Sequence, residues 1–394
     1  MGLIGALAFV AALLFSVMVH EFGHFATARR YGMHVTEFFL GFGKRIWSTR
    51  RGETEFGIKA IPAGGYCKIS GMSPREPLQP EIESRAFYKA SVPKKLVVLG
   101  SGSALHLLLG VLLLFTLFAG VGTTQVLPNV AEVVACVPSG EECTATDPIS
   151  PAKIAGLKAG DEILSINSDS AMKWDEITPI LRANANRKVT LRIKRDGVIQ
   201  DISLTLAERK VNGETRGYLG IVNQIGQVRK NPIDAATATA TTTREMLAGS
   251  IHALVGLPSQ IPSLFRETFL GEKRKADGLV GVVGVARASS QTASSGLLTM
   301  GEKIATFLLI VASLNIFVGV FNLLPILPLD GGHMAVALFE GARRSLARMR
   351  GRPDPGPADV EKLTPITFVV VMILIALSLL LLFADIFNPI NLNL

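Results

Sequence analysis

The sequence predicts a multi-pass α-helical membrane protein with about four transmembrane helices, a membrane-associated β-hairpin region on the cytoplasmic side and one α+β domain outside the membrane. The 394 residues are 48% hydrophobic and 18% charged, a mixture that suits membrane spans joined to a soluble module. Four apolar stretches are long enough to cross a bilayer. Short alternating runs between glycines follow the first stretch, and a compact soluble region follows the second.

The four apolar stretches define the predicted spans. They are residues 2–27, 95–122, 304–326 and 365–386. Residues 2–19 carry no charged side chain, and the first basic residues, Arg29 and Arg30, come after this run. A signal peptide has its positive residues before the apolar run, so this stretch is interpreted as a span.

Basic residues predict the orientation of the chain. Arg29 and Arg30 follow the first span, so the positive-inside rule places the N-terminus outside. Four spans then put residues 28–94 and 340–363 in the cytoplasm, and residues 123–302 and the C-terminus outside. Both cytoplasmic loops are rich in lysine and arginine, as the rule requires. The same bias accounts for the net charge of +8, so we expect no nucleic-acid partner.

The loop after the first span is punctuated by glycine, from Gly41 and Gly43 to Gly64 and Gly65. Short runs of alternating apolar and basic residues between such turns predict β-hairpins. A free strand edge, which we expect around Ile58, can pair with an extended peptide by strand addition. The alternative is an ordinary surface hairpin.

Residues 126–225 have the pattern of a compact soluble domain. Gly156–Asp161 leads into an apolar strand, a helical stretch follows at Trp174–Asn184, and alternating strands lie at 189–195 and 202–206. An Asp-Gly hairpin turn separates the last two. The pattern resembles a PDZ domain of the bacterial protease-associated kind, and that resemblance implies peptide or ectodomain ligands bound by strand addition.

The three cysteines predict at most one disulfide. Cys136 and Cys143 flank a turn-forming stretch on the predicted outer side, where an oxidising exterior favours a bridge between them. The alternative is two unrelated small residues. Cys67 falls in the cytoplasmic loop and is expected to be a free thiol.

Residues 226–302 are interpreted as an extracytoplasmic linker region. Residues 233–257 have helical character with few charges and suit an amphipathic helix lying on the outer membrane face. A fifth span is the alternative. Pro258, Pro262 and Arg266 interrupt it, and it would invert the later topology.

A His-Glu-Phe-Gly-His sequence lies at the end of the first apolar run, at His20, Glu21 and His24. Residues i and i+4 of a helix share one face, so both imidazoles can reach one metal ion, and Glu21 lies beside that face, where it can accept a proton from water. Ionisable groups inside a span are costly and are functional candidates by default. The alternative is an amphipathic helix end at the membrane surface.

A catalytic zinc ion needs three protein ligands and one open position, so the two histidines need a partner. The best candidate is Asp330, in the sequence Asn-Leu-Leu-Pro-Ile-Leu-Pro-Leu-Asp-Gly-Gly-His at 322–333. Prolines end regular helix, and unwound backbone at membrane depth is tolerated only where it lines a cavity or is buried in protein. Residue counts place His20 and Asp330 in the cytoplasmic halves of their spans. The alternative for Asp330 is a helix N-cap at a cytoplasmic loop.

With these motifs the chain resembles the site-2 protease family of intramembrane zinc metalloproteases, of the bacterial regulator-of-sigma-factor protease type, with one PDZ domain. The resemblance covers nearly the whole chain and implies a Zn²⁺ cofactor. The residues it assigns are the metal ligands His20, His24 and Asp330, the general base Glu21, and the substrate-binding residues Asn322, Pro325, Pro328 and Gly43. His333 belongs to the motif but is not expected to bind the metal.

The resemblance implies cleavage of transmembrane segments in regulated intramembrane proteolysis, with anti-sigma factors or remnant signal peptides as substrates. It also implies a bacterial plasma (inner) membrane location, with the active site in the cytoplasmic half of the bilayer. The expected domains are a first catalytic membrane half (1–125), a PDZ domain (126–225), the linker region (226–302) and a second catalytic membrane half (303–394).

The chain departs from the family pattern at two points. Many relatives carry Gly-Pro-x-x-Asn at the start of the second span, and here His106 stands at the asparagine position. His106 is either a further group near the zinc or a hydrogen-bonded packing residue. Well-known relatives have two PDZ domains, whereas this chain shows one. The rival functions are a PDZ-bearing scaffold and a metal transporter, but no internal repeat supports a transporter.

Overall fold

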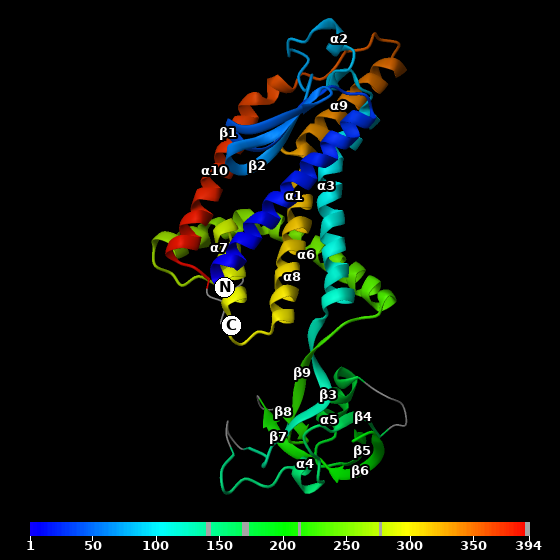
Figure 1. Cartoon of the computed structure of the whole chain (residues 1–394), viewed down its shortest axis with the longest axis vertical. Helices are drawn as coiled ribbons and strands as arrows, with labels where there is room; N and C mark the ends of the chain where they lie inside the picture. Colours follow the sequence, from blue (N-terminus) through cyan, green and yellow to red (C-terminus); the bar gives the residue numbers. More distant parts are fainter. Residues whose placement is uncertain (139–142, 168–172, 212–213, 276–277, 391–394) are drawn as a thin grey trace. The chain divides into compact units, whose positions relative to one another are not determined.

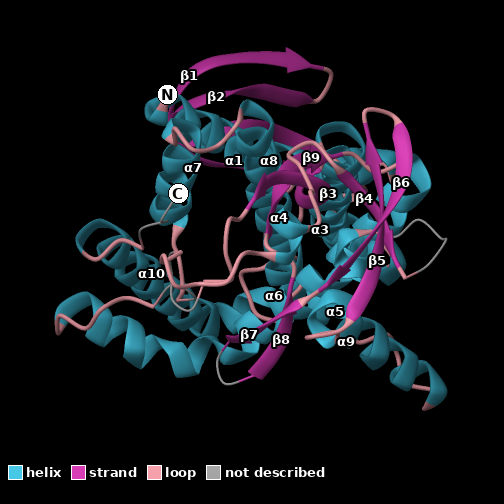
Figure 2. Ribbon diagram, turned by 90° about the horizontal axis from the view of Figure 1, so that it is seen from below, coloured by secondary structure: helices cyan, strands magenta, loops and turns pink. Residues whose placement is uncertain are grey.

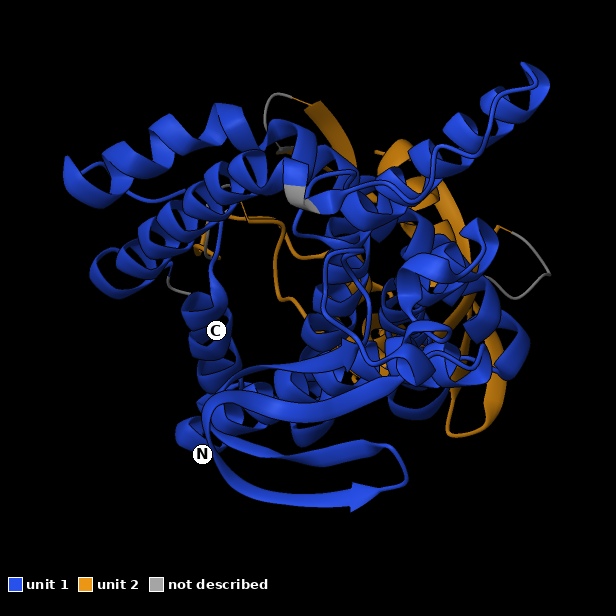
Figure 3. Ribbon diagram, turned by 90° about the horizontal axis from the view of Figure 1, so that it is seen from above, with its two compact units in different colours: residues 1–122, 229–394 blue, residues 123–228 orange. Residues whose placement is uncertain are grey.

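The computed structural model describes residues 1–138, 143–167, 173–211, 214–275 and 278–390. The chain divides into two compact units, shown in Figure 3. The helical unit comprises Met1–Gly122 and Arg229–Leu394, and the sheet unit comprises Thr123–Val228. Strands β1 and β2 are the strands of the described part of the helical unit, and its other regular elements are helices (Figure 2).

Four helices among the described residues are long and apolar enough to cross a membrane, which confirms the four predicted spans. They are α1 (Gly2–Arg30), α3 (Val92–Phe115) with its π-helical extension η2 (Thr116–Val121), α8 (Met300–Asn322) and α10 (Thr364–Phe387). α3 packs along both α1 and α8 (Figure 1). Leu114 of α3 and Ile316 of α8 are fully buried in this contact.

Helices outside the four spans complete the unit. They are α2 (Pro80–Glu83), η1 (Phe87–Lys89), α6 (Pro232–Phe269), α7 (Val282–Ser294), α9 (Asp330–Met349) and η3 (Val360–Leu363). α6 is not one of the candidate spans. α6 continues through Pro258 and Pro262 to Phe269, beyond the helical stretch expected at 233–257. Each proline removes only one backbone donor, and the other turns of a long helix retain their bonds.

β1 (Val35–Arg51) and β2 (Thr54–Ile69) form a long antiparallel hairpin that folds back on itself. Phe38 pairs with Cys67 on one side and with Phe56 on the other, and Phe56 also pairs with Thr49. The pairings make a sheet of four limbs, in the order 45–51, 54–61, 35–42 and 64–69. β1 bends at glycines 41 and 43, whose positive φ angles favour glycine.

The expectation of a free strand edge around Ile58 is wrong. Ile58 pairs with both Leu40 and Trp47, so its limb is an inner one. Within this fully described hairpin, the limbs paired on one side only are 45–51 and 64–69. The hairpin folds back on itself, so the 54–61 limb pairs with the neighbouring limb 45–51 and also with the limb 35–42. The second pairing joins residues far apart in the sequence, and local patterns do not predict it.

The sheet unit contains a five-stranded antiparallel sheet in the order β6-β5-β4-β3-β9, and a separate β7–β8 hairpin. Its strands are β3 (Thr123–Val133), β4 (Glu162–Ile166), β5 (Lys188–Arg195), β6 (Val198–Thr205), β7 (Ala207–Val211), β8 (Glu214–Tyr218) and β9 (Ile221–Val228), with helices α4 (Pro151–Ile154) and α5 (Trp174–Ala183). Alternate residues of β4 and β5, among them Ile163, Leu191 and Ile193, are fully buried against Ile177 of α5. The predicted helix and both predicted strands are present.

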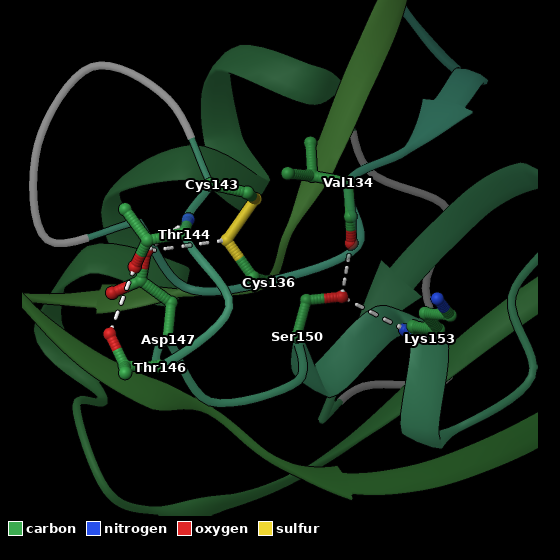
Figure 4. Close-up of a disulfide and its surroundings, with 8 residues drawn as sticks. All are labelled: Val134, Cys136, Cys143, Thr144, Thr146, Asp147, Ser150 and Lys153. Carbon is green, nitrogen blue, oxygen red and sulfur yellow. Dashed lines mark hydrogen bonds between the residues drawn. A yellow bond between two sulfur atoms is a disulfide. The ribbon is translucent and has the colours of Figure 1, made fainter.

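A disulfide joins Cys136 and Cys143 in the sheet unit (Figure 4). Asp147 braces the same loop, because its Oδ2 accepts hydrogen bonds from both the backbone N–H and the hydroxyl of Thr144. Ser150 ends the loop by donating to the Val134 carbonyl and capping α4. These contacts join the described segments between β3 and α4, residues 134–138 and 143–150. Cys67 of β2 is a free thiol, as expected.

Candidate metal centre

The two histidines of the His-Glu-Phe-Gly-His sequence lie on one face of α1, where both are buried. α1 and α3 approach each other closely at this level. A Cβ at Gly23 of α1 would lie 2.7 Å from the Ser101 carbonyl oxygen, and a Cβ at Gly102 of α3 would lie 2.6 Å from Cε1 of His20. Glycine at both positions therefore allows the helices to enclose the His20 ring.

Asp330 reaches the same place from the other half of the helical unit. α8 ends at Asn322, and α9 starts at Asp330 after an irregular connection that contains a cis Leu327–Pro328 peptide. The first turn of α9 packs directly on this connection. A Cβ at Gly331 would lie 2.3 Å from the Leu323 carbonyl oxygen, so only glycine fits there. The close packing holds the first carboxylate of α9 at a fixed position.

Three donor atoms meet at this point. The Nε2 atoms of His20 and His24 are 3.0 Å apart, and they lie 3.2 Å and 3.4 Å from Oδ2 of Asp330. Ligands bound to tetrahedral zinc at roughly 2.0–2.2 Å are about 3.3 Å from each other. Asp330 Oδ2 is also buried without a hydrogen-bond partner among the described residues. The donor set, its spacing and this unsatisfied atom fit a zinc ion.

A hydrogen bond from α3 orients His24. Nδ1 of His24 lies 2.8 Å from the backbone carbonyl oxygen of Val98. A carbonyl accepts from an N–H, so Nδ1 carries the proton and Nε2 presents its lone pair to the donor cluster. Such a partner fixes both the tautomer and the ring orientation of a metal-binding histidine.

His106 lies beside the donor cluster but is not one of its members. Its ring centroid is 5.0 Å from that of His20, and its Nδ1 lies 2.8 Å from Oδ1 of Asn315. Asn315 in turn donates to the hydroxyl of Ser16, 3.0 Å away. Among the described residues, the group whose atoms lie close enough to share a metal is His20, His24 and Asp330. The packing alternative for His106 therefore fits the geometry.

Glu21 lies between the histidines and the sheet. The backbone N–H of Cys67 in the 64–69 limb interacts with its carboxylate. A Cβ at Gly65 in the same limb would lie 3.6 Å from Cγ of Glu21 and 2.7 Å from Sδ of Met18. The limb can lie this close to α1 because glycine stands at residue 65.

The predicted substrate-binding residues lie in two places. Asn322 is the half-buried last residue of α8, and Pro325 and Pro328 are exposed in the connection that leads to Asp330. Pro325 lines an apolar cavity of about 770 Å³ with residues of α9 and the segment before α10. Gly43 lies at the bend of β1, between the Phe42–Ile61 and Arg45–Lys59 pairs. The substrate-binding role of these four residues stays a prediction.

Two groups of α3 that support the donor cluster, the Val98 carbonyl and Gly102, were not predicted from the sequence. The Val98 carbonyl has no sequence signal, since any residue can supply it. Gly102 stands at the glycine position of the Gly-Pro-x-x-Asn pattern, but its contact with the His20 ring depends on the packing of two helices. His333, which was not expected to bind metal, is half-buried in the first turn of α9.

Comparison with known proteins decides the family. Residues 8–353 match the family described as Peptidase family M50. The chain belongs to peptidase family M50. The matched range contains both the His-Glu-Phe-Gly-His sequence and Asp330. The predicted family is thereby confirmed.

Known proteins are similar to this chain over most of its length. The zinc metalloprotease Rip1 of Mycobacterium tuberculosis (strain H37Rv) is 34% identical over 408 residues, which cover 98% of both chains. A putative zinc metalloprotease of Rickettsia conorii is 26% identical, covering 95% of this chain and 98% of the relative. The regulator of sigma-E protease RseP of Salmonella typhimurium is 24% identical, covering 84% and 90%. The predicted zinc metalloprotease class, its Zn²⁺ cofactor and the multi-pass membrane character are confirmed.

Proposed function

We propose that this chain is an intramembrane endopeptidase that cleaves transmembrane segments of membrane proteins in regulated intramembrane proteolysis. Anti-sigma factors or remnant signal peptides are the proposed substrates, by analogy with the relative named a regulator of sigma-E protease. One observation carries the proposal. The three clustered donor atoms come from α1, a candidate span, and from the residue that follows the connection after α8, another candidate span.

His20, His24 and Asp330 would hold the zinc ion, which when bound supplies a Lewis acid and lowers the pKa of water. Glu21 follows His20 directly, and in our proposal its carboxylate takes the proton of the attacking water and returns it to the leaving amine. Val98 keeps His24 in the tautomer that can bind metal. The protein chain thus contributes ligand orientation and proton transfer.

A transmembrane substrate must unwind before its peptide bond can react, because helical carbonyls are held in i to i−4 hydrogen bonds. The 64–69 limb lies against Glu21 and is paired on one side only within the hairpin, so it can bind an unwound segment by strand addition. In this proposal Asn322, Pro325 and Pro328 contact the opposite side of that segment. Gly43, at the bend of β1, is the fourth residue that we propose to contact the substrate.

The proposed orientation follows the positive-inside rule, with both termini outside, the hairpin and α9 on the cytoplasmic side, and the cleavage site in the cytoplasmic half of a bacterial plasma membrane. Exposed apolar side chains on the hairpin, Phe42, Ile46 and Trp47, support its contact with lipid. In this assignment residues 1–125 and 303–394 are the catalytic halves, and residues 226–302 link the PDZ domain to the second half.

We assign residues 126–225, within the sheet unit, as one extracytoplasmic PDZ domain. β9 is the terminal strand of its five-stranded sheet, and it follows the Gly217–Gly220 stretch. A Cβ at Gly217 would lie 2.1 Å from the Leu181 carbonyl oxygen, so this stretch packs against the end of α5. A terminal strand can add the strand of a peptide or ectodomain ligand. We propose that the domain admits substrates only after another protease has trimmed them.

The decisive experiment separates metal binding from cleavage. The chain, Glu21→Gln and Glu81→Gln are reconstituted in liposomes with a membrane-spanning anti-sigma factor segment, and zinc content and cleavage are measured. Glu21→Gln should retain zinc and lose cleavage, because only the proton acceptor is removed. Glu81 is an exposed residue of α2, so its variant should match the wild type. Full cleavage by Glu21→Gln would refute the proposed role of Glu21, whereas absence of cleavage by the wild type would favour a scaffold or transporter.

A second comparison tests the proposed filter. Intact substrate and substrate trimmed to its membrane segment are offered to the same liposomes. The trimmed form should be cleaved much faster, since its outer domain no longer meets the PDZ domain. Equal rates would refute the filter and leave the cleavage assignment unaffected.

A further inference from the structure

A buried ion pair joins α3 to α9 away from the donor cluster. Nζ of Lys95 lies 2.9 Å from both carboxylate oxygens of Glu340. The side chains are 3% and 4% exposed, respectively. Lys95 also lies over the ring of Phe87. Two charges are rarely removed from water in this way unless their geometry is fixed, because desolvation of each ion is costly.

The pair connects the two halves of the candidate metal centre through one helix. Lys95 is in the first turn of α3, and Val98, whose carbonyl binds His24, is in the next turn. Glu340 is ten residues after Asp330 in α9, about 15 Å along a continuous helix. α3 therefore contacts His24 through the Val98 carbonyl, and it contacts α9, which begins with Asp330, through Lys95.

Other contacts concentrate at the same point of α9. Arg344 lies 3.1 Å from the Glu340 carboxylate, whose Oε2 also accepts from the Ala358 N–H at 3.3 Å. A Cβ at Gly341 would lie 3.3 Å from Val92 of α3, so the two helices are in contact there. On the other side of α9, Leu338 and Phe339 are exposed. The inward-facing carboxylate of Glu340 is therefore the polar attachment of α9 to α3.

We propose that the Lys95–Glu340 pair is a positioning device that sets Asp330 against the two histidines. The inference depends on the proposed role of Asp330 as a metal ligand. Lys95 fixes the distance and rotation of α9 relative to α3, and small shifts of a helix move its first residue by a similar amount. Ligand distances in metal sites lie within about 0.2 Å of their standard values. Loss of the pair should therefore weaken zinc binding although neither residue touches the donor atoms.

The test measures zinc affinity of the full-length chain in detergent by competition with a chelator, together with the visible spectrum of the Co²⁺-substituted protein. Lys95→Met and Glu340→Gln should each weaken metal binding at least tenfold, the range seen when supporting partners of metal ligands are removed, and should change the Co²⁺ spectrum. Lys95→Arg, which keeps the charge, should restore most of the affinity. The charge exchange Lys95→Glu with Glu340→Lys should bind better than either single exchange.

A second buried ion pair offers a matched control. Arg274 and Asp385 are 2% and 0% exposed and lie 2.9 Å apart, near the C-terminal end of α10. Arg274→Met should lower thermal stability as Lys95→Met does, yet leave zinc affinity and the Co²⁺ spectrum unchanged. Equal losses of metal affinity in the two variants would overturn the proposal, because general destabilisation would then explain both.

Asp330→Ala distinguishes a wrong assignment of the metal ligands from a wrong role for the Lys95–Glu340 pair. If Asp330→Ala binds zinc like the wild type, Asp330 is not a ligand and the proposed function fails at its site. If Asp330→Ala loses zinc while Lys95→Met and Glu340→Gln keep wild-type affinity, the ligand set stands and the positioning role is wrong. The expected result is that Asp330→Ala, Lys95→Met and Glu340→Gln all lose zinc affinity, whereas Arg274→Met keeps the wild-type zinc affinity.

Discussion

Replacing Gly102 by alanine tests the packing around the donor cluster directly. The added Cβ would lie 2.6 Å from Cε1 and 2.7 Å from both nitrogens of the His20 ring. Carbon atoms in contact are about 3.5–4.0 Å apart, so the ring or α3 must move by about 1 Å. Overpacking of this kind costs about 1–3 kcal/mol. If that strain falls on the bound state, zinc binding weakens roughly 5- to 150-fold.

The assay is chelator competition for zinc on the detergent-solubilised chain, with cleavage of a membrane-spanning substrate as a second measurement. Gly100→Ala is the matched control, because its Cβ would lie 3.7 Å from Met334, an ordinary contact on the same helix. It should bind zinc like the wild type. Unchanged zinc affinity in Gly102→Ala would show that the His20 ring is not confined as described, and the reasoning from packing would fail.

Three further predictions follow from the structure. Cys67→Pro removes the N–H that faces Glu21 and should slow cleavage roughly fivefold at unchanged zinc content, whereas Cys67→Ala should have little effect. Burial of Asp161 opposes its ionisation, but hydrogen bonds from Arg195 and the Lys158 N–H outweigh burial and keep the pKa of Asp161 below its usual value. The sheet unit should therefore lose this stabilisation as pH falls below about 4. Arg195→Met should lower the stability of the sheet unit at pH 7, as measured by hydrogen exchange of β4 and β5. Removing zinc from protein kept in free zinc at about 1,000 times the Kd should lower the stability of the helical unit by about 4.1 kcal/mol. Identical thermal transitions before and after chelation would contradict bound zinc.

Local spacing made the first half of the centre readable from the sequence. Two histidines four residues apart in an apolar run share a face on any α-helix, so their proximity on α1 needed no tertiary information. Asp330 could be paired with them only from residue type and membrane depth. The connection before it was anticipated because Pro325 and Pro328 prevent regular helix.

The helix that follows Asp330 was not predicted. α9 starts without a capping side chain, since its N-cap residue is Leu329, and its sequence combines two glycines with several arginines. These features resemble a cytoplasmic loop when they are read locally. The order of the four hairpin limbs could not be predicted for a related reason. Each limb has an ordinary strand pattern, and only long-range pairing decides which limb is central.

The role of α3 explains why side-chain motifs describe this centre incompletely. α3 contributes a backbone carbonyl at Val98, the absence of a side chain at Gly102 and a charge at Lys95 that meets Glu340 across 245 residues of sequence. Neither a carbonyl nor a missing Cβ has a characteristic residue pattern. α1 carries the chemistry, but its two imidazoles reach a common point with Asp330 because α3 is packed between α1 and α9. A substitution that thickens α3 at Gly102, where the added Cβ meets the His20 ring, should therefore damage metal binding more than changes to many polar residues nearer the surface.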